Sequence, residues 1–341
     1  MRTSSITLRL ALGALTAAAA AAGGSAEEIK RGGTAIIHMA SEQRILNPAL
    51  RASTGVYNIT GKIVEPLIDK TYDGYEPVLA TEWSSSDDGL TITLKLREGV
   101  RWHDGEPFSC DDVAFTAMEM WKPLLNYSST LQQYLESVDC PDPHTAVFNY
   151  SQPMPLGLFL AAMPDLGHPM PKHLYEGTDI LKNELNTAPV GTGPFKFVEY
   201  ERGQYVLAER NDDYWRGEEY PYLDKIVWRF IKDKSAAAAA LEAGQVHESG
   251  FNGVSMADVE RLANDDRFDV GTKGYENNVA HSTVEFNHRN PILADVKVRQ
   301  AIYHGLNIDY AIETIMRGFA KPGRGPIPSA GGINYTDEVT T

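Results

Sequence analysis

Apolar and polar residues alternate along 90–97, and this pattern predicts a strand with one buried face. The turn residues Asp87-Asp88-Gly89 precede it, so 83–86 should fold back as the partner strand of a hairpin. After the strand, Ser109 stands before an apolar face at helical spacing, which predicts a capped helix ending at Pro123. We expect the rest of the chain to be organised around this unit.

The remaining pattern predicts an alternation of strands and helices. Further strands are expected at 34–39, 145–150, 195–200, 205–210, 226–231 and 283–287. Helices are expected near 56–64, at 129–137, 235–242 and 256–262, and as one or two segments within 296–317. The proline-rich stretch 153–171 is predicted to be a loop. This mixture is typical of an α/β protein, and the length predicts two or more domains.

Several segments resemble one known family, and they follow each other in the family's order. They are VEPLIDKTYDGYEPVLATEW, SDDGLTITLKLREGVRWHDGEPFSCDDVAFT, PVGTGPFKF, RNDDYWRG and DVKVRQAI. These segments are similar to the family 5 solute-binding proteins of ABC importers, the dipeptide, oligopeptide and nickel type. The resemblance extends from about residue 33 to about residue 328.

This resemblance implies a two-lobed α/β periplasmic binding fold, type II-like and of cluster C, with a small domain inserted in the first lobe. Carried over to this chain, 27–71 and 190–273 form the first lobe, 72–189 form the inserted domain, and 274–341 begin the second lobe. Family members continue further, so we expect a C-terminally truncated chain with an incomplete second lobe.

The function implied is capture of a small solute, with a peptide or peptide-like compound as the leading ligand. The solute would pass to ABC permease and ATPase subunits in the inner membrane. An opine, an oligosaccharide, haem or a nickel chelate remains an alternative ligand. A secreted hydrolase and a holdase that binds unfolded chains are the rival classes, although no catalytic motif is recognisable and no enzyme activity is expected.

Candidate ligand-binding residues follow from the same resemblance. In similar proteins the loop after the first strand lines the ligand cavity, which suggests Glu42, Gln43, Arg44 and Ile45; plain solvent exposure of this loop is the alternative. Further candidates are one of the aromatic residues Trp121 and Tyr127, the proline-flanked His168, and Asn287 near the expected hinge. The turn at Trp102 and His103 is interpreted as architecture.

The N-terminus predicts export. Residues 1–26 combine Arg2 and Arg9, a short apolar run and a small-residue cleavage site, which is typical of a signal peptide. The net charge of −15 becomes −17 when these two arginines are removed, and this disfavours nucleic acid as a partner. A monomeric, free periplasmic protein is expected.

The chain has two cysteines, Cys110 and Cys140. In an oxidising compartment they would pair as a disulfide, and two buried thiols are the alternative. The histidines are scattered, with no metal-ligand spacing, so neither a metal nor a cofactor is expected.

Overall fold

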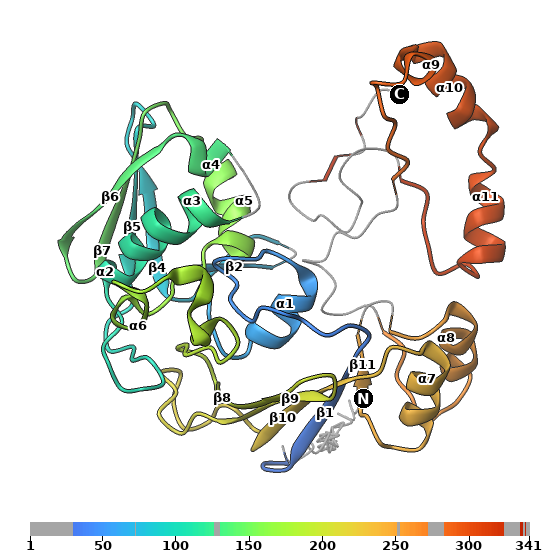
Figure 1. Ribbon diagram of the computed structural model, residues 1–341, viewed down its shortest axis with the longest axis horizontal. Helices are drawn as coiled ribbons and strands as arrows, with labels where there is room; N and C mark the ends of the chain where they lie inside the picture. Colours follow the sequence, from blue (N-terminus) through green and yellow to red (C-terminus); the bar gives the residue numbers. More distant parts are fainter. Residues whose placement is uncertain are drawn as a thin grey trace, which may run out of the picture. The chain divides into compact units, whose positions relative to one another are not determined.

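The computed structural model describes residues 30–71, 73–125, 130–250, 253–271, 283–323, 335–336 and 338 (Figure 1). Contacts divide the chain into two units, Met1–Lys30 and Arg31–Thr341, and the helices and strands of the described residues belong to the second unit. The expected signal peptide and Tyr127 lie outside the described residues. Within the described ranges, no helix combines the length and apolar character that crossing a membrane requires.

A five-stranded sheet has the order β11-β1-β10-β9-β8. Its strands are β1 (Thr34–Met39), β8 (Phe195–Glu201), β9 (Tyr205–Arg210), β10 (Lys225–Phe230) and β11 (Glu248–Ser249). β1 runs parallel to β10 and β11, and the other pairs are antiparallel. The predictions for β1, β8, β9 and β10 are confirmed. β11 was missed because two residues carry no readable period.

A four-stranded antiparallel sheet has the order β4-β5-β7-β6. Its strands are β4 (Ala80–Ser85), β5 (Thr91–Leu96), β6 (Leu135–Asp142) and β7 (Thr145–Tyr150). The alternating pattern of β5 buries Ile92, Leu94 and Leu96, and β4 pairs with β5 as the predicted hairpin. A two-stranded sheet of β2 (Ile68–Lys70) and β3 (Tyr75–Pro77) completes the strands of the described residues.

The predicted helix at 129–137 is wrong beyond its first turn. Only α4 (Thr130–Gln133) is helical, and β6 follows at once. β6 pairs with β7 through two shifts in register, so its inward residues lose the period of two that marks a strand. Pairing with the next strand, β7, therefore decided the structure against the pattern within the segment itself.

The helix expected after Ser109 is present as α2 (Cys110–Phe115), followed by a π-helical stretch (Thr116–Trp121) and α3 (Lys122–Leu124). Ser109 and Asp112 form a capping box, in which the Asp112 carboxylate accepts from the Ser109 amide at 2.9 Å. Asp112 also accepts from Trp102 Nε1 at 3.2 Å and from the Lys172 amide at 2.9 Å. Because the carboxyl is buried, its pKa is raised despite these donors.

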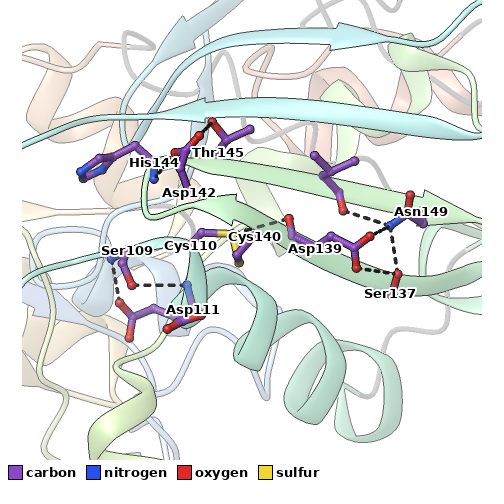
Figure 2. The surroundings of a disulfide bond; sticks show 12 residues. Ser109, Cys110, Asp111, Ser137, Asp139, Cys140, Asp142, His144, Thr145 and Asn149 are labelled. Atoms are coloured by element: carbon purple, nitrogen blue, oxygen red, sulfur yellow. Dashed lines mark hydrogen bonds between the residues drawn. A yellow bond between two sulfur atoms is a disulfide. The ribbon is translucent and has the colours of Figure 1, made fainter.

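Cys110 and Cys140 form a disulfide that joins the first turn of α2 to β6 (Figure 2). Their Cα atoms lie 5.7 Å apart. Next to the bridge, Asn149 on β7 donates to Ser137 Oγ and to the Asp139 carboxylate, both at 2.9 Å. The disulfide ties α2 to β6, and the Asn149 hydrogen bonds tie β6 to β7.

The proline-rich stretch 153–171 contains a helix, so the loop prediction is wrong there. α5 (Leu156–Leu166) begins after Pro155, where a missing N–H has no cost, and it carries Pro164 in its last turn. Its buried side chains include Phe159, whose ring meets Phe148 edge-on at a centroid distance of 5.3 Å. Packing against the four-stranded sheet stabilises this helix in spite of its prolines.

The other α-helices of the described residues are α1 (Thr54–Thr60), α6 (Lys172–Tyr175), α7 (Lys234–Glu242), α8 (Met256–Ala263), α9 (Pro291–Ala294), α10 (Val296–Gly305) and α11 (Ile308–Tyr310). Two short 3-10 helices lie at Ile180–Lys182 and Glu184–Asn186, and a π-helical stretch lies at Ala311–Ile315. The predictions at 235–242, 256–262 and 296–317 are confirmed. The predicted strand at 283–287 is wrong, because these residues pair with no strand in the described part of the chain.

The turn at 191–194 joins segments that are far apart in sequence. The Gly193 amide donates to the Ile63 carbonyl at 2.9 Å, and a Cβ atom added at Gly191 would lie 1.8 Å from that same carbonyl oxygen. Thr192 donates to the buried Glu65 carboxylate at 3.0 Å, and Tyr214 donates to it at 2.6 Å. Burial raises the pKa of Glu65. Only glycine permits the approach at 191, which explains the GTG sequence.

The predicted division into lobes and an inserted domain stays a prediction. The strands of the five-stranded sheet come from 34–39 and 195–249, whereas those of the four-stranded sheet come from 80–150. One continuous hydrophobic core contains buried residues of both sheets, among them Trp228, Val206, Leu94 and Phe148.

Candidate functional site

A cavity of about 130 Å³ lies where β1 ends. It is lined by His38, Met39, Ala40, Ser41, Thr54, Gly55, Asn58, Gly250 and Gly253. These residues come from the end of β1, from α1 and from the segment after β11. Since β1 is parallel to both its neighbours, the cavity lies at the carboxyl end of parallel strands, where α/β proteins usually bind ligands.

His38 supports the floor of this cavity. The ring is buried, with Nδ1 2.8 Å from Ser249 Oγ and Nε2 2.8 Å from the Ile231 carbonyl oxygen. A carbonyl oxygen only accepts, so Nε2 carries a hydrogen and donates to Ile231. Both ring nitrogens are therefore used within the protein, and His38 positions β11 beside β1.

Glu42, in the loop after β1, holds this loop against the β8–β9 hairpin. Its Oε1 accepts from the Gly203 amide at 3.0 Å and from the Tyr200 hydroxyl at 2.9 Å. These two hydrogen bonds, the one from Gly203 first, lower the pKa of Glu42. Tyr200 also lies 2.6 Å from the Gln43 carbonyl oxygen, and its pKa is raised to about 12, chiefly by burial. The carboxylate thus contacts the hairpin and acts as an anchor for the loop.

The next loop residues differ in what they offer to a ligand. The Gln43 side chain folds back on Ser41, with Nε2 3.1 Å from Ser41 Oγ, and its amide packs on Gly55, where an added Cβ would lie 2.4 Å from Nε2. Arg44 is exposed and forms no ion pair with any described residue. Ile45 is half-buried. Arg44 is therefore the loop side chain that is free to meet a ligand.

The other candidates lie elsewhere. Trp121 is only 1% exposed and belongs to the hydrophobic core, which argues against contact with a ligand and corrects that interpretation. His168 is 3% exposed and stacks on Tyr57 at 5.3 Å. Burial lowers the pKa of His168 to about 4, and its environment is that of a packed core histidine. Asn287 is exposed and its Oδ1 accepts from the Arg289 amide at 3.0 Å, within a turn rather than at a strand end.

A second, larger hollow of about 710 Å³ lies over the end of the four-stranded sheet. Its lining is Thr81, Glu82, Lys95, Leu96, Arg97, Glu98, Asp142, His144 and Thr145. Lys95 donates to Thr145 at 2.8 Å, and Arg97 stacks on the Trp215 ring at 4.3 Å, so both cations already have protein partners. Among the described residues, no group of three or more His, Cys, Asp or Glu side chains could hold a metal ion.

Comparison with known proteins decides the family. The profile of "Bacterial extracellular solute-binding proteins, family 5 Middle" matches residues 74–340. The chain belongs to this family.

This family 5 protein is similar to other members over most of its length. It is 34% identical over 279 residues to a protein of Brucella ovis named as a putative ABC transporter peptide-binding protein, a match that covers 80% of this chain and 50% of the relative. The crystal structure of the oligopeptide-binding protein AppA from Bacillus subtilis, in complex with a nonapeptide, superposes with a TM-score of 0.76 at 25% identity. That match covers 92% of this chain and 61% of AppA.

A third match concerns a different ligand. NikZ from Campylobacter jejuni, in complex with Ni(L-His), gives a TM-score of 0.70 at 27% identity, covering 86% of this chain and 57% of NikZ. Both neighbours are two-lobed binding proteins of mixed α/β structure, so the chain has the predicted α/β binding-protein fold. The chain spans about half the length of the curated relatives it matches.

None of the predicted ligand-binding residues is among the described residues that line the cavity, although Ala40 and Ser41, directly before Glu42, are. Contact of the loop 42–45 with a ligand stays a prediction. Asn58, Gly250 and Gly253 were not candidates. The end of β1 was a usable signal, because strand 34–39 was predicted correctly. Nothing local indicates that Ser249 and Gly253 lie beside His38, since that proximity results from the parallel pairing of β11 with β1.

Proposed function

We propose that this protein is the substrate-binding component of an ABC importer. It captures a small solute, closes around it by a hinge motion, and delivers it to permease and ATPase subunits in the inner membrane. The protein acts as a monomer in the periplasm after removal of residues 1–26, binds no nucleic acid and catalyses no reaction. The observation that carries the proposal is the cavity at the end of β1 in a chain of family 5.

A peptide is the leading ligand class. Support comes from the peptide-binding name of the Brucella ovis relative and from the nonapeptide bound to AppA. Within this chain, Arg44 is the side chain proposed to contact the ligand, and Glu42 and Gln43 hold its loop in place. The nickel-histidine complex of NikZ keeps a metal chelate as the second candidate ligand.

The first test is native mass spectrometry of the protein purified from the periplasm of the bacterium that produces it. The second is thermal unfolding of the protein with peptide, opine, oligosaccharide, haem and nickel-chelate libraries. A co-purified peptide and a rise in melting temperature with peptides only are expected. Peptides recovered uncut after incubation separate a binder from a hydrolase. If no library raises the melting temperature, the importer role is refuted.

The variant Arg44→Ala tests whether the loop after β1 contacts the ligand. Arg101 is also exposed, so Arg101→Ala is the control for loss of one surface arginine. Arg44→Ala is expected to weaken binding of the identified ligand by about tenfold, the effect of one lost charge-assisted contact. Equal affinities of the two variants would remove Arg44 from the site.

A further inference from the structure

The cavity at the end of β1 has a size that selects among ligand groups. Its volume of about 130 Å³ is slightly below the roughly 150 Å³ of an engineered protein cavity that accepts benzene. A side chain of up to about six heavy atoms would fill it, whereas an indole ring would not fit. Threonine, valine and asparagine side chains lie within this limit.

One wall of the cavity, at Gly253, resists enlargement. A Cβ atom at Gly253 would lie 2.2 Å from Ser249 Oγ and 2.9 Å from His38 Nδ1, so the backbone there already touches the His38–Ser249 pair. On the other side, Gly55 packs against the Gln43 side chain with similar closeness. At Gly253 the buried His38 ring lies against the backbone, so this side of the cavity cannot widen easily, whereas at Gly55 the neighbouring atoms are the end of the Gln43 side chain.

The side chains that line the cavity carry no acidic or basic group other than the His38 ring. None of the nine lining residues is Asp, Glu, Lys or Arg, and both nitrogens of His38 are engaged with Ser249 and Ile231. A ligand charge placed here would lose its hydration without gaining a counter-charge, which is strongly unfavourable. The side chains of Thr54 and Asn58 make no hydrogen bond to another described residue, and they are exposed at the rim. They can form hydrogen bonds with a hydroxyl or an amide group of the ligand.

We propose that this cavity is a subsite for one small, uncharged side chain of the ligand. The assignment rests on the proposed function, since it takes the ligand to be a peptide. It makes the first lobe of this protein selective at one ligand position.

The test uses the complete protein, freed of bound ligand, and tetra-alanine in which each position is replaced in turn by Thr, Val, Lys, Glu or Trp. Affinities are measured by titration calorimetry. At one position, Thr and Val are expected to bind at least about tenfold more tightly than Lys, Glu and Trp, because only these fit without a buried charge. Equal tolerance at all positions would overturn the assignment.

Two variants connect that position to the cavity. Asn58→Asp adds a carboxylate at the rim and should raise the affinity of the Lys peptide at that position by about tenfold, while weakening the Glu peptide. Asn264→Asp makes the same change at the exposed end of α8, outside the lining, and should leave the ranking unchanged. If the two variants behave alike, the cavity is not the subsite.

A different outcome concerns the function itself. If no peptide of the series binds the unaltered protein, the peptide ligand fails, and the subsite assignment fails with it. Binding without positional preference, in contrast, leaves the proposed function intact and refutes the subsite alone.

Discussion

Acid is expected to destabilise the protein at the turn 191–194, because this turn is hydrogen-bonded to the buried ring of His103. The ring connects to the turn at 191–194 on both sides: Nε2 donates to the Gly193 carbonyl at 3.0 Å, and Nδ1 accepts from the Gly191 amide at 3.2 Å. Only the neutral ring can make both bonds, because a protonated Nδ1 no longer accepts. Burial lowers the pKa of His103 to about 4.

The sign and size of the effect follow from this shift. An unfolded histidine has a pKa of about 6.5, so the unfolded chain binds a proton well before the folded one does. The stabilising contribution is complete above pH 6.5 and is lost as the pH falls toward 4, at about 1.4 kcal/mol per pH unit. Between pH 7 and pH 5, His103 alone should cost about 2 kcal/mol of unfolding free energy.

The assay is urea unfolding at several pH values, comparing the protein with His103→Gln. Glutamine can donate to Gly193 and accept from Gly191 but does not titrate, so the stability difference between the two proteins isolates the ring. This comparison is needed because the raised pKa values of Glu65 and Asp112 act in the opposite direction. The exposed His288→Gln controls for the substitution itself.

The stability advantage of the unaltered protein over His103→Gln should shrink by about 2 kcal/mol from pH 7 to pH 5. A constant difference across this range would refute the argument that His103 is held neutral by its contacts.

Three further predictions concern the framework. Replacing Cys110 and Cys140 together by serine opens a disulfide with a sequence separation of 30 and should cost about 3 to 4 kcal/mol of unfolding free energy. Dithiothreitol should lower the melting temperature of the unaltered protein and leave the double variant unchanged. Gly191→Ala should cost about 4 kcal/mol or more in urea unfolding, whereas Gly157→Ala on α5, with open space around its Cβ position, should be neutral or stabilising. Tyr200→Phe should cost about 1 kcal/mol, and the double variant with Glu42→Ala should lose less than the sum of the two single changes, since both remove the same hydrogen bond. If the two losses of unfolding free energy add, Glu42 and Tyr200 do not stabilise the protein through a shared hydrogen bond.

The fold was predictable where a local period coincides with a tertiary face. β5 reads as a strand because Ile92 and Leu94 point into the core while their neighbours face outward. The strand β6 was not predicted because a shift in register between Leu135 and Ser137 interrupts its alternation. The helix α5 was not predicted because Pro155 and Pro164 suggested a loop. In both cases contacts with β7 residues such as Phe148 outweighed the pattern within the segment itself.

The site was predictable only in part, for a similar reason. The position of the loop after β1 was predictable from the correctly predicted strand before it, whereas its contact with a ligand stays a prediction. The roles within it were not, because Glu42 looks like any exposed acid until the hairpin turn at Gly203 is brought against it. Trp121 shows the opposite error: an aromatic residue with no sequence mark of burial lies in the core. Exposure and partners are tertiary properties, and only they separate a ligand contact from a structural one.

The loop after β1 is held at both ends, and this limits which of its residues could respond to a solute. At its start, Glu42 is bonded to the β8–β9 hairpin. At its end, the Leu46 amide donates to the Asn186 carbonyl at 2.7 Å, and the fully buried Asn47 donates to the Asn186 side chain at 2.9 Å. Between these anchors Arg44 keeps an unengaged, exposed head group among the described residues. A preorganised loop of this kind loses little conformational entropy on binding, so the energy of an Arg44 contact would contribute to affinity rather than to ordering the loop.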